Sequence, residues 1–186
     1  MGGRPMGQAT PLQALRQAAA SLAPPYEVTD SDASHVALDT SDVALPALTL
    51  RLQKERRLFS RTFALVVEAS APGDRPEGDA SALLRWKGLR RRPALVAGDP
   101  AGEAWVDRLE GSGLLEGVRT MTNVESLEAR WDATRGLAVL RMTTLAGALI
   151  GTTPGSAVAV PLEPDDVEGL LRILRGLTRA AGPSGP

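Results

Sequence analysis

Apolar and polar residues alternate along much of the chain with the period of a half-buried strand. Leu48, Leu50 and Leu52 are separated by polar residues, and the segment 61–69 has the same period. A strand with one apolar and one polar face is typical of an antiparallel sheet that is covered on one side. We predict strands at 26–30, 35–39, 47–53, 61–69, 81–87, 94–97, 125–132, 136–144 and 156–161.

Three other segments have the period of an amphipathic helix. The first begins at Thr10, a preferred N-cap residue, and two prolines at 24 and 25 end it. The second begins with Asp99 and Pro100, which resemble a cap followed by a first-turn proline. The third has acidic residues in its first turn and arginines in its last turn, an arrangement that complements the helix dipole. We predict helices at 10–23, 99–109 and 164–179.

These elements predict an α+β fold. We expect a mainly antiparallel sheet, with an N-terminal helix, a middle helix and a C-terminal amphipathic helix packed on one face. The length of 186 residues suits one domain. We assign residues 10–180 to this domain and expect disordered ends at 1–9 and 181–186. If the domain has a subdomain break, the loop 71–80, rich in proline and glycine, is the place for it.

One long stretch, from Met142 to Leu162, contains no charged residue. Its length would suffice to cross a bilayer, but Pro154 would break such a helix, so we expect no transmembrane segment. We predict instead a loop of small residues between two strands. This uncharged loop would either cover the core or receive a partner.

The composition excludes several kinds of catalytic site. The chain has no cysteine, which excludes disulfides, thiolate zinc sites and cysteine nucleophiles. His35 is the single histidine, and its neighbours Asp32 and Ser34 do not suggest a triad, because a triad is assembled in space rather than from adjacent residues. Gly111, Gly113 and Gly117 are spaced one residue too widely for a dinucleotide-binding loop, and we interpret them as turns.

An acidic cluster could hold Mg²⁺ in principle. It consists of Glu163, Asp165, Asp166 and Glu168 at the start of the C-terminal helix. The helix dipole alone explains carboxylates at this position. We therefore predict no metal, no cofactor and no catalytic residue, and we keep an enzyme that uses carboxylates alone as a third alternative.

The formal net charge of −1 conceals an uneven distribution. Residues 1–50 carry two basic and five acidic side chains, residues 51–61 carry five basic and one acidic, and residues 85–92 carry five basic and none acidic. Aromatic residues stand within both basic blocks. Our candidate binding residues are Arg56, Arg57, Phe59, Arg61, Arg85, Trp86, Lys87, Arg90, Arg91 and Arg92.

The two basic blocks allow more than one function. If they are neighbours in the sheet, they would form one surface. We predict a non-catalytic interaction or scaffolding module that binds a protein partner or a second copy through this basic, aromatic-bearing sheet surface and the uncharged loop 142–162. The alternative is a protein that binds nucleic acid or anionic lipid, since cations interleaved with aromatics suit phosphates and stacked bases or headgroups. The blocks could also protect a sheet edge, or pair with the acidic stretch 99–132. The alanine, arginine and glycine content favours a bacterial origin, and the absence of an apolar leader favours the cytoplasm.

Overall fold

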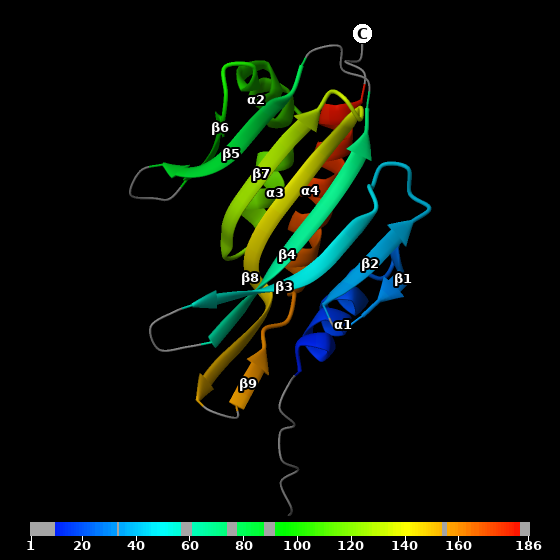
Figure 1. Ribbon diagram of the computed structural model, residues 1–186, viewed down its shortest axis with the longest axis vertical. Coiled ribbons are helices and arrows are strands. Elements are labelled where there is room, and N and C mark those ends of the chain that lie inside the picture. The colour runs from blue at the N-terminus through cyan, green and yellow to red at the C-terminus, as the bar shows by residue number, and fades with distance from the viewer. Residues whose placement is uncertain are drawn as a thin grey trace, which may run out of the picture.

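The computed structural model describes residues 10–32, 34–56, 61–73, 78–87, 92–153 and 156–182. Within these residues the fold is α+β, as predicted: helices pack on one face of a nine-stranded antiparallel sheet (Figure 1). The strands are β1 (Tyr26–Ser31), β2 (His35–Thr40), β3 (Leu48–Arg56), β4 (Arg61–Pro72), β5 (Ala80–Lys87), β6 (Arg92–Ala97), β7 (Val124–Asp132), β8 (Leu137–Thr153) and β9 (Ser156–Ala159). The helices are α1 (Pro11–Ser21), α2 (Gly102–Gly111), α3 (Leu114–Thr120) and α4 (Pro164–Ala181).

The strands follow one another across the sheet in the order β1-β2-β3-β4-β8-β7-β5-β6. β9 lies off this path and pairs with the last part of β8. β1 and β6 are therefore the two ends of this path, β9 is a further edge strand because its pairing is with β8 alone, and β8 lies in the middle, where it pairs with β4 on one side and β7 on the other. β4 ends at Pro72, at the start of the 71–80 segment, and it pairs with β8, which follows that segment, so one sheet and one core contain residues from both sides of it.

The ends of α1 agree with the sequence. The amide of Gln13 donates to Thr10 Oγ1 at 3.2 Å, and the amide of Thr10 donates to Gln13 Oε1 at 2.9 Å. This reciprocal capping box satisfies two amides that the first helical turn leaves without partners. The N-cap prediction at Thr10 is confirmed.

None of the described helices is both long and apolar enough to cross a membrane.

The predicted start of the middle helix at Asp99 is wrong. α2 begins at Gly102, and its N-cap residue Ala101 makes no capping bond through its side chain. Asp99 instead accepts a hydrogen bond of 2.6 Å from the hydroxyl of Ser81 on β5. Asp99 therefore bonds to the neighbouring strand and does not cap the helix. No local sequence pattern reveals this contact.

The predicted loop in the uncharged stretch 142–162 is also wrong. Residues 137–153 are a single strand, β8, which continues into β9 across a short connection. Four consecutive residues, 146–149, are buried, so both faces of β8 are covered over this part, which explains the lack of charges there. Gly147 has φ +79°, which favours glycine, and it lies where the pairing register with β4 shifts.

Glycines bring α3 and α4 into backbone contact. A Cβ atom on Gly117 would lie 2.5 Å from the carbonyl oxygen of Gly169, and one on Gly176 would lie 2.9 Å from the Cα atom of Leu114. The interpretation of Gly117 as a turn is therefore wrong, because it lies within α3 and permits close approach to α4. Gly113 does lie in a turn, with φ +84°.

Two tryptophans fill the core beneath the other half of the sheet. Trp105 of α2 and Trp131 of β7 have ring centroids 6.2 Å apart, inclined at 51°. The indole Nε1 of Trp105 donates to the carbonyl of Ala129 at 3.0 Å. All three residues are buried, so this contact holds α2 against β7.

Candidate interaction surface

The structure places the two basic blocks at the ends of two hairpins. Arg56 and Arg61 are cross-strand partners at the end of β3 and the beginning of β4, and Lys87 and Arg92 are partners across β5 and β6. Four of the candidate residues lie outside the described residues: Arg57, Phe59, Arg90 and Arg91.

Both basic hairpin ends lie at the same end of the strands, but they do not lie on neighbouring strands. β3 and β5 run in the same direction, so the β3–β4 and β5–β6 hairpins turn at the same end of the sheet (Figure 1). Two further strands, β8 and β7, separate β4 from β5. The blocks are thus not on adjacent strands, which was the condition for a single basic surface.

The second block presents its cations and its aromatic ring in different directions. Arg85 and Arg92 are exposed, and neither makes an ion pair with another described residue. Trp86 is 40% exposed and pairs with Pro93, whereas Arg85 pairs with Ala94. Because successive side chains of a strand point to opposite faces, Arg85 lies on the open face of the sheet and Trp86 on the face that the helices cover.

Paired charges run across the middle of the open face. Glu68 on β4 lies opposite Arg141 on β8, which lies opposite Glu128 on β7. Arg51 Nη2 of β3 bonds Glu68 Oε1, and Arg141 Nε lies 3.7 Å from the same oxygen. Arg130 Nη2 lies 2.6 Å from Glu128 Oε1. Arg51, a member of the first basic block, is therefore neutralised within the sheet.

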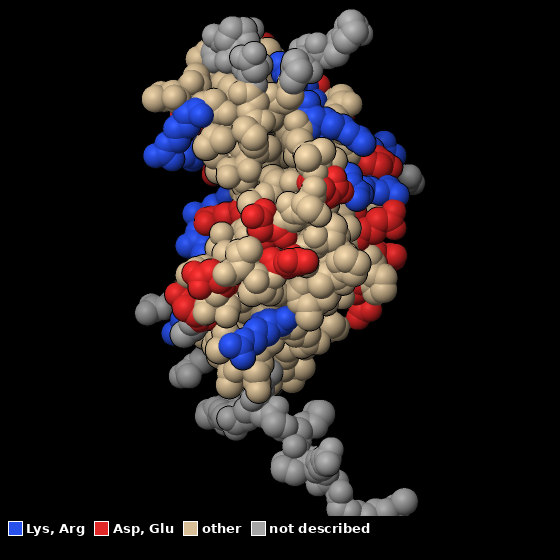
Figure 2. Space-filling view, turned by 90° about the vertical axis from the view of Figure 1, so that its right-hand side faces the viewer, with Lys and Arg blue, Asp and Glu red and all other residues tan. Residues whose placement is uncertain are grey.

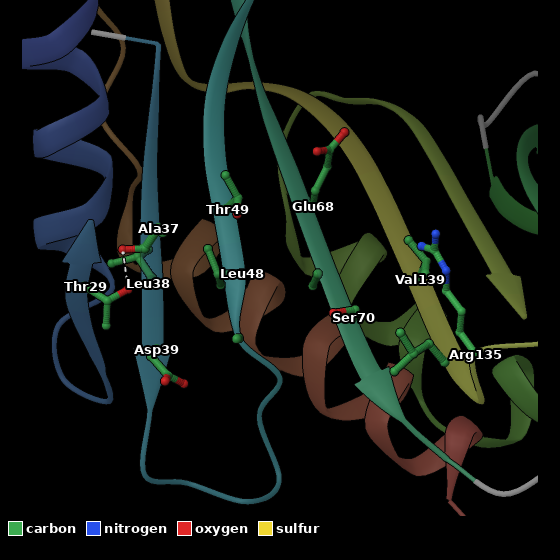
Figure 3. Close-up of a pocket in the computed structure, with 13 residues that line it drawn as sticks. Thr29, Ala37, Leu38, Asp39, Leu48, Thr49, Glu68, Ser70, Arg135 and Val139 are labelled. Atoms are coloured by element: carbon green, nitrogen blue, oxygen red, sulfur yellow. Dashed lines mark hydrogen bonds between the residues drawn. The ribbon is translucent and has the colours of Figure 1, made fainter. Parts of the chain in front are cut away.

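A hollow of about 440 Å³ opens beside these pairs, on the face that the helices leave uncovered. Thr49, Glu68 and Ser70 reach it from β3 and β4, and Arg135 reaches it from the connection between β7 and β8 (Figure 3). Asp39, Ala37 and Val139 also line it. The hollow thus combines hydroxyls, short aliphatic side chains and charges of both signs. This mixture is better suited to binding a protein surface than to binding a polyanion.

Sequence reasoning missed the residues of this hollow. They come from β1, β2, β3, β4 and β8, together with the connection before β8. No motif joins them, because they are brought together by a strand order in which β8 is inserted next to β4. The alternation in β3 and β4 indicated that their polar residues share one face. It could not indicate which other strands lie beside them.

An acidic edge adjoins the hollow. No lysine or arginine occurs between Arg16 and Arg51, while five acidic residues do. They are Glu27, Asp30, Asp32, Asp39 and Asp42, on β1, β2 and the loops that follow these strands. Acidic side chains gather in the middle of the side that Figure 2 presents, where β1 and β2 lie in Figure 1.

The imidazole of His35 lies beside two carboxylates of this edge. Its Nδ1 lies 3.0 Å from Asp32 Oδ2, and its Nε2 lies 3.6 Å from Asp30 Oδ2. The pKa of Asp32 is lowered to about 2, chiefly by the hydrogen bond from the amide of Ser34, and further by that residue's hydroxyl and the amide of His35. Asp32 therefore stays ionised at any pH at which the protein is handled.

The acidic cluster at the start of α4 does not converge on a common point. Asp166 turns into the protein and accepts hydrogen bonds from Thr122, whereas Glu168 pairs with Arg172 one helical turn away. Among the described residues, no group of acidic or histidine side chains is arranged to hold a metal ion.

Comparisons with protein-family models, with curated proteins and with solved structures gave no match. What the protein can bind is therefore inferred from its own surface. That surface offers the hollow on the open face, the acidic β1 edge beside it, and Arg85 and Arg92 of the β5–β6 hairpin, which make no ion pair with another described residue.

Proposed function

We propose that this protein is a cytoplasmic, non-catalytic interaction module, and that a protein partner or a second copy docks on the open face of its sheet. The hollow of about 440 Å³ on that face carries the proposal. A sheet that is covered by helices on one face and hollowed on the other offers a rigid, preformed surface. The uncharged segment 142–162 is no longer part of the proposed surface, because Ala146, Ala148 and Leu149 within it are buried.

The charges beside the hollow support a protein partner over a polyanion. Arg51 and Arg141 share the carboxylate of Glu68, and Arg141 also lies opposite Glu128, so charges of both signs alternate across the middle of the face. Paired charges of this kind select a partner by complementary position and contribute less to overall affinity. Thr49, Ser70 and Val139 supply the hydroxyl and aliphatic contacts that a protein interface also needs.

We expect Ser70→Arg to weaken partner binding, because the larger cationic side chain would fill the hollow. Affinity isolation from the source cells with tagged wild type, followed by titration of the isolated partner, measures the effect. The dissociation constant should rise at least about tenfold, which is the loss of roughly one good interfacial contact.

Ser126→Arg is the matched control. Ser126 is an exposed serine in β7 that does not line the hollow. This variant should bind the partner as the wild type does, and both variants should keep the wild-type melting temperature. Equal binding by the wild type and by Ser70→Arg would remove the open face as the docking surface.

One observation supports a second function, the binding of nucleic acid or anionic lipid. Arg85 and Arg92 are exposed near the end of the β5–β6 hairpin and make no ion pair with another described residue. The second function predicts that replacing both with alanine weakens binding to single-stranded DNA or to anionic vesicles. The slope of log K against log salt should fall by about 1.5, because each phosphate contact contributes roughly 0.7–0.9.

Arg119 and Arg172 provide the control pair. Both are exposed arginines on helices, and each pairs with a glutamate of its own helix. Their double alanine variant should bind the polyanion like the wild type. If the wild type itself is not retained by any polyanion at low salt, the second function is excluded.

A further inference from the structure

The strands at the two ends of the main path, β1 and β6, differ in how they resist further pairing. β6 begins with Arg92 and Pro93, and both residue types discourage the addition of another strand. β1 contains no proline and no basic residue, and every residue of it after Tyr26 is exposed. Its pairing with β2 is interrupted by a bulge between Val28 and Asp30. Of these two strands, β1 is therefore the one more open to a further strand.

The backbone of β1 offers hydrogen-bonding groups at Val28. In the first cross-strand pair, the amide of Tyr26 donates to the carbonyl of Leu22 and the amide of Thr40 donates to Asp39 Oδ1, so neither amide donates across the strands. Bonded and non-bonded pairs alternate in an antiparallel ladder. Tyr26 with Thr40 is therefore a pair without backbone hydrogen bonds, the next pair is hydrogen-bonded, and the third pair, Val28 with Leu38, again has none. The N–H and C=O of Val28 therefore point away from β2.

A groove of about 480 Å³ runs between this edge and α1. Most of its helical wall consists of small residues, Ala19, Ala20 and Ala23, with Arg16 also lining it, and its strand wall includes Tyr26, Glu27 and the side chain of Val28, which is 56% exposed. Burial raises the pKa of Tyr26, and its hydroxyl donates to the carbonyl of Pro46 at 2.7 Å, which anchors the start of β1. The groove can accept short aliphatic side chains from an added strand.

The opposite face of the β1 edge is acidic. Glu27 lies opposite Asp39 on β2, and Asp30 lies opposite Ala37, so the three carboxylates share the open face. Within the described part of the chain, none of the three pairs with lysine or arginine, and Asp30 has only His35 beside it. An added strand would therefore meet carboxylates with one set of alternate residues and the apolar groove with the other set.

We propose that the β1 edge binds an extended segment of a partner protein as an additional strand, and that this segment alternates lysine or arginine with small aliphatic residues. Backbone bonds to Val28 would supply part of the affinity, and the carboxylates and the groove would supply the selectivity. A second copy is a poor occupant, because two β1 strands paired antiparallel would bring the acidic residues of both copies together. This site goes beyond the proposed function, since it is separate from the hollow and takes an extended segment.

A proline at position 28 tests the backbone part of the proposal. Val28→Pro removes the outward N–H while keeping the bonds to β2, since an edge strand tolerates proline where its N–H faces solvent. The probe is a short fluorescent peptide that alternates lysine and valine, measured by fluorescence anisotropy. We expect the dissociation constant of this peptide to rise by about tenfold in the variant, as for one lost backbone hydrogen bond.

Val43→Pro is the matched control. Val43 is 94% exposed and occupies the second position of the turn that the bond from the Leu45 amide to the Asp42 carbonyl closes. Proline is favoured at that position, so this variant should fold and bind the peptide as the wild type does.

Two further peptides, measured with the wild-type protein, separate the contribution of the charges from that of the backbone hydrogen bonds. A peptide that alternates glutamate and valine should not bind the wild type, and N-methylation of alternate amides in the lysine peptide should weaken binding by about tenfold. Equal binding of the two charge patterns, or binding unaffected by both Val28→Pro and N-methylation, would overturn the proposal. A dimer in light scattering that Val28→Pro dissociates would assign the edge to a second copy and overturn it as well. None of these outcomes depends on Ser70, so the hollow and the edge can fail separately.

Discussion

Gly117→Ala is expected to lower the free energy of unfolding by about 3 kcal/mol, as for an overpacked core position. The added Cβ would lie 2.5 Å from the carbonyl oxygen of Gly169, 2.7 Å from Ile173 Cγ1 and 2.8 Å from the amide nitrogen of Ile173. Two of these three atoms belong to the backbone of α4, so the contact can be relieved only by moving one helix away from the other. Alanine favours a helix over glycine by up to about 1 kcal/mol, and this gain is too small to offset the clash. Urea unfolding of purified protein measures the change.

Gly111→Ala separates the packing effect from helix propensity. Gly111 is the last residue of α2, and a Cβ there would meet nothing within 4 Å. This variant should unfold at the same urea concentration as the wild type or at a slightly higher one. If Gly117→Ala behaved like Gly111→Ala, the close approach of α3 and α4 would be disproved.

Asp166→Ala is expected to have a comparable effect, a loss of about 3 kcal/mol in the free energy of unfolding, since hydrogen bonds to a charged group contribute roughly 1.5–3 kcal/mol. Asp166 is 2% exposed. Its Oδ1 accepts from the amide of Thr122 at 2.8 Å and from the hydroxyl of that residue at 2.9 Å, and its Oδ2 accepts from the amide of Glu163 at 3.3 Å. The substitution leaves these three donors without their acceptor and detaches the start of α4 from the segment before β7. Chemical denaturation is again the measurement.

Asp165→Ala provides the comparison one residue away. Asp165 belongs to the same acidic first turn of α4 but is exposed. Its removal should cost only its interaction with the helix dipole, between about 0.3 and 1 kcal/mol. Similar losses for the two variants would mean that helix charge, and not the buried contact with Thr122, determines the role of Asp166.

Local patterns predicted much of the fold. The alternation at Leu48, Leu50 and Leu52 predicted the strand that the structure shows as β3, and all three side chains lie on the face that packs against the helices. The capping residues of α1 and the charges of α4 likewise placed these helices to within a few residues. In each case the residues that determine the element lie within a single strand or within one or two helical turns. Propensity and periodicity are sufficient to predict structure over such short segments.

The candidate surface depended on information that no local pattern contains. Arg51 belongs to a basic block in the sequence, yet the register between β3, β4 and β8 sets it beside Glu68. The same register makes Asp39, Ser70 and Arg135 neighbours of one hollow. The uncharged stretch was misassigned because a strand covered on both faces loses the alternation by which a half-buried strand is identified.

The central position of β8 has a consequence for the order in which the protein can be made. β4 is complete once residue 72 has been synthesised, but its partner begins only at residue 137. Until then the nascent chain presents β4 as an unpaired border, a template on which other chains can assemble. The core therefore cannot close until β8 has been synthesised, so the sheet reaches its native pairing only after residues up to about 153 have left the ribosome.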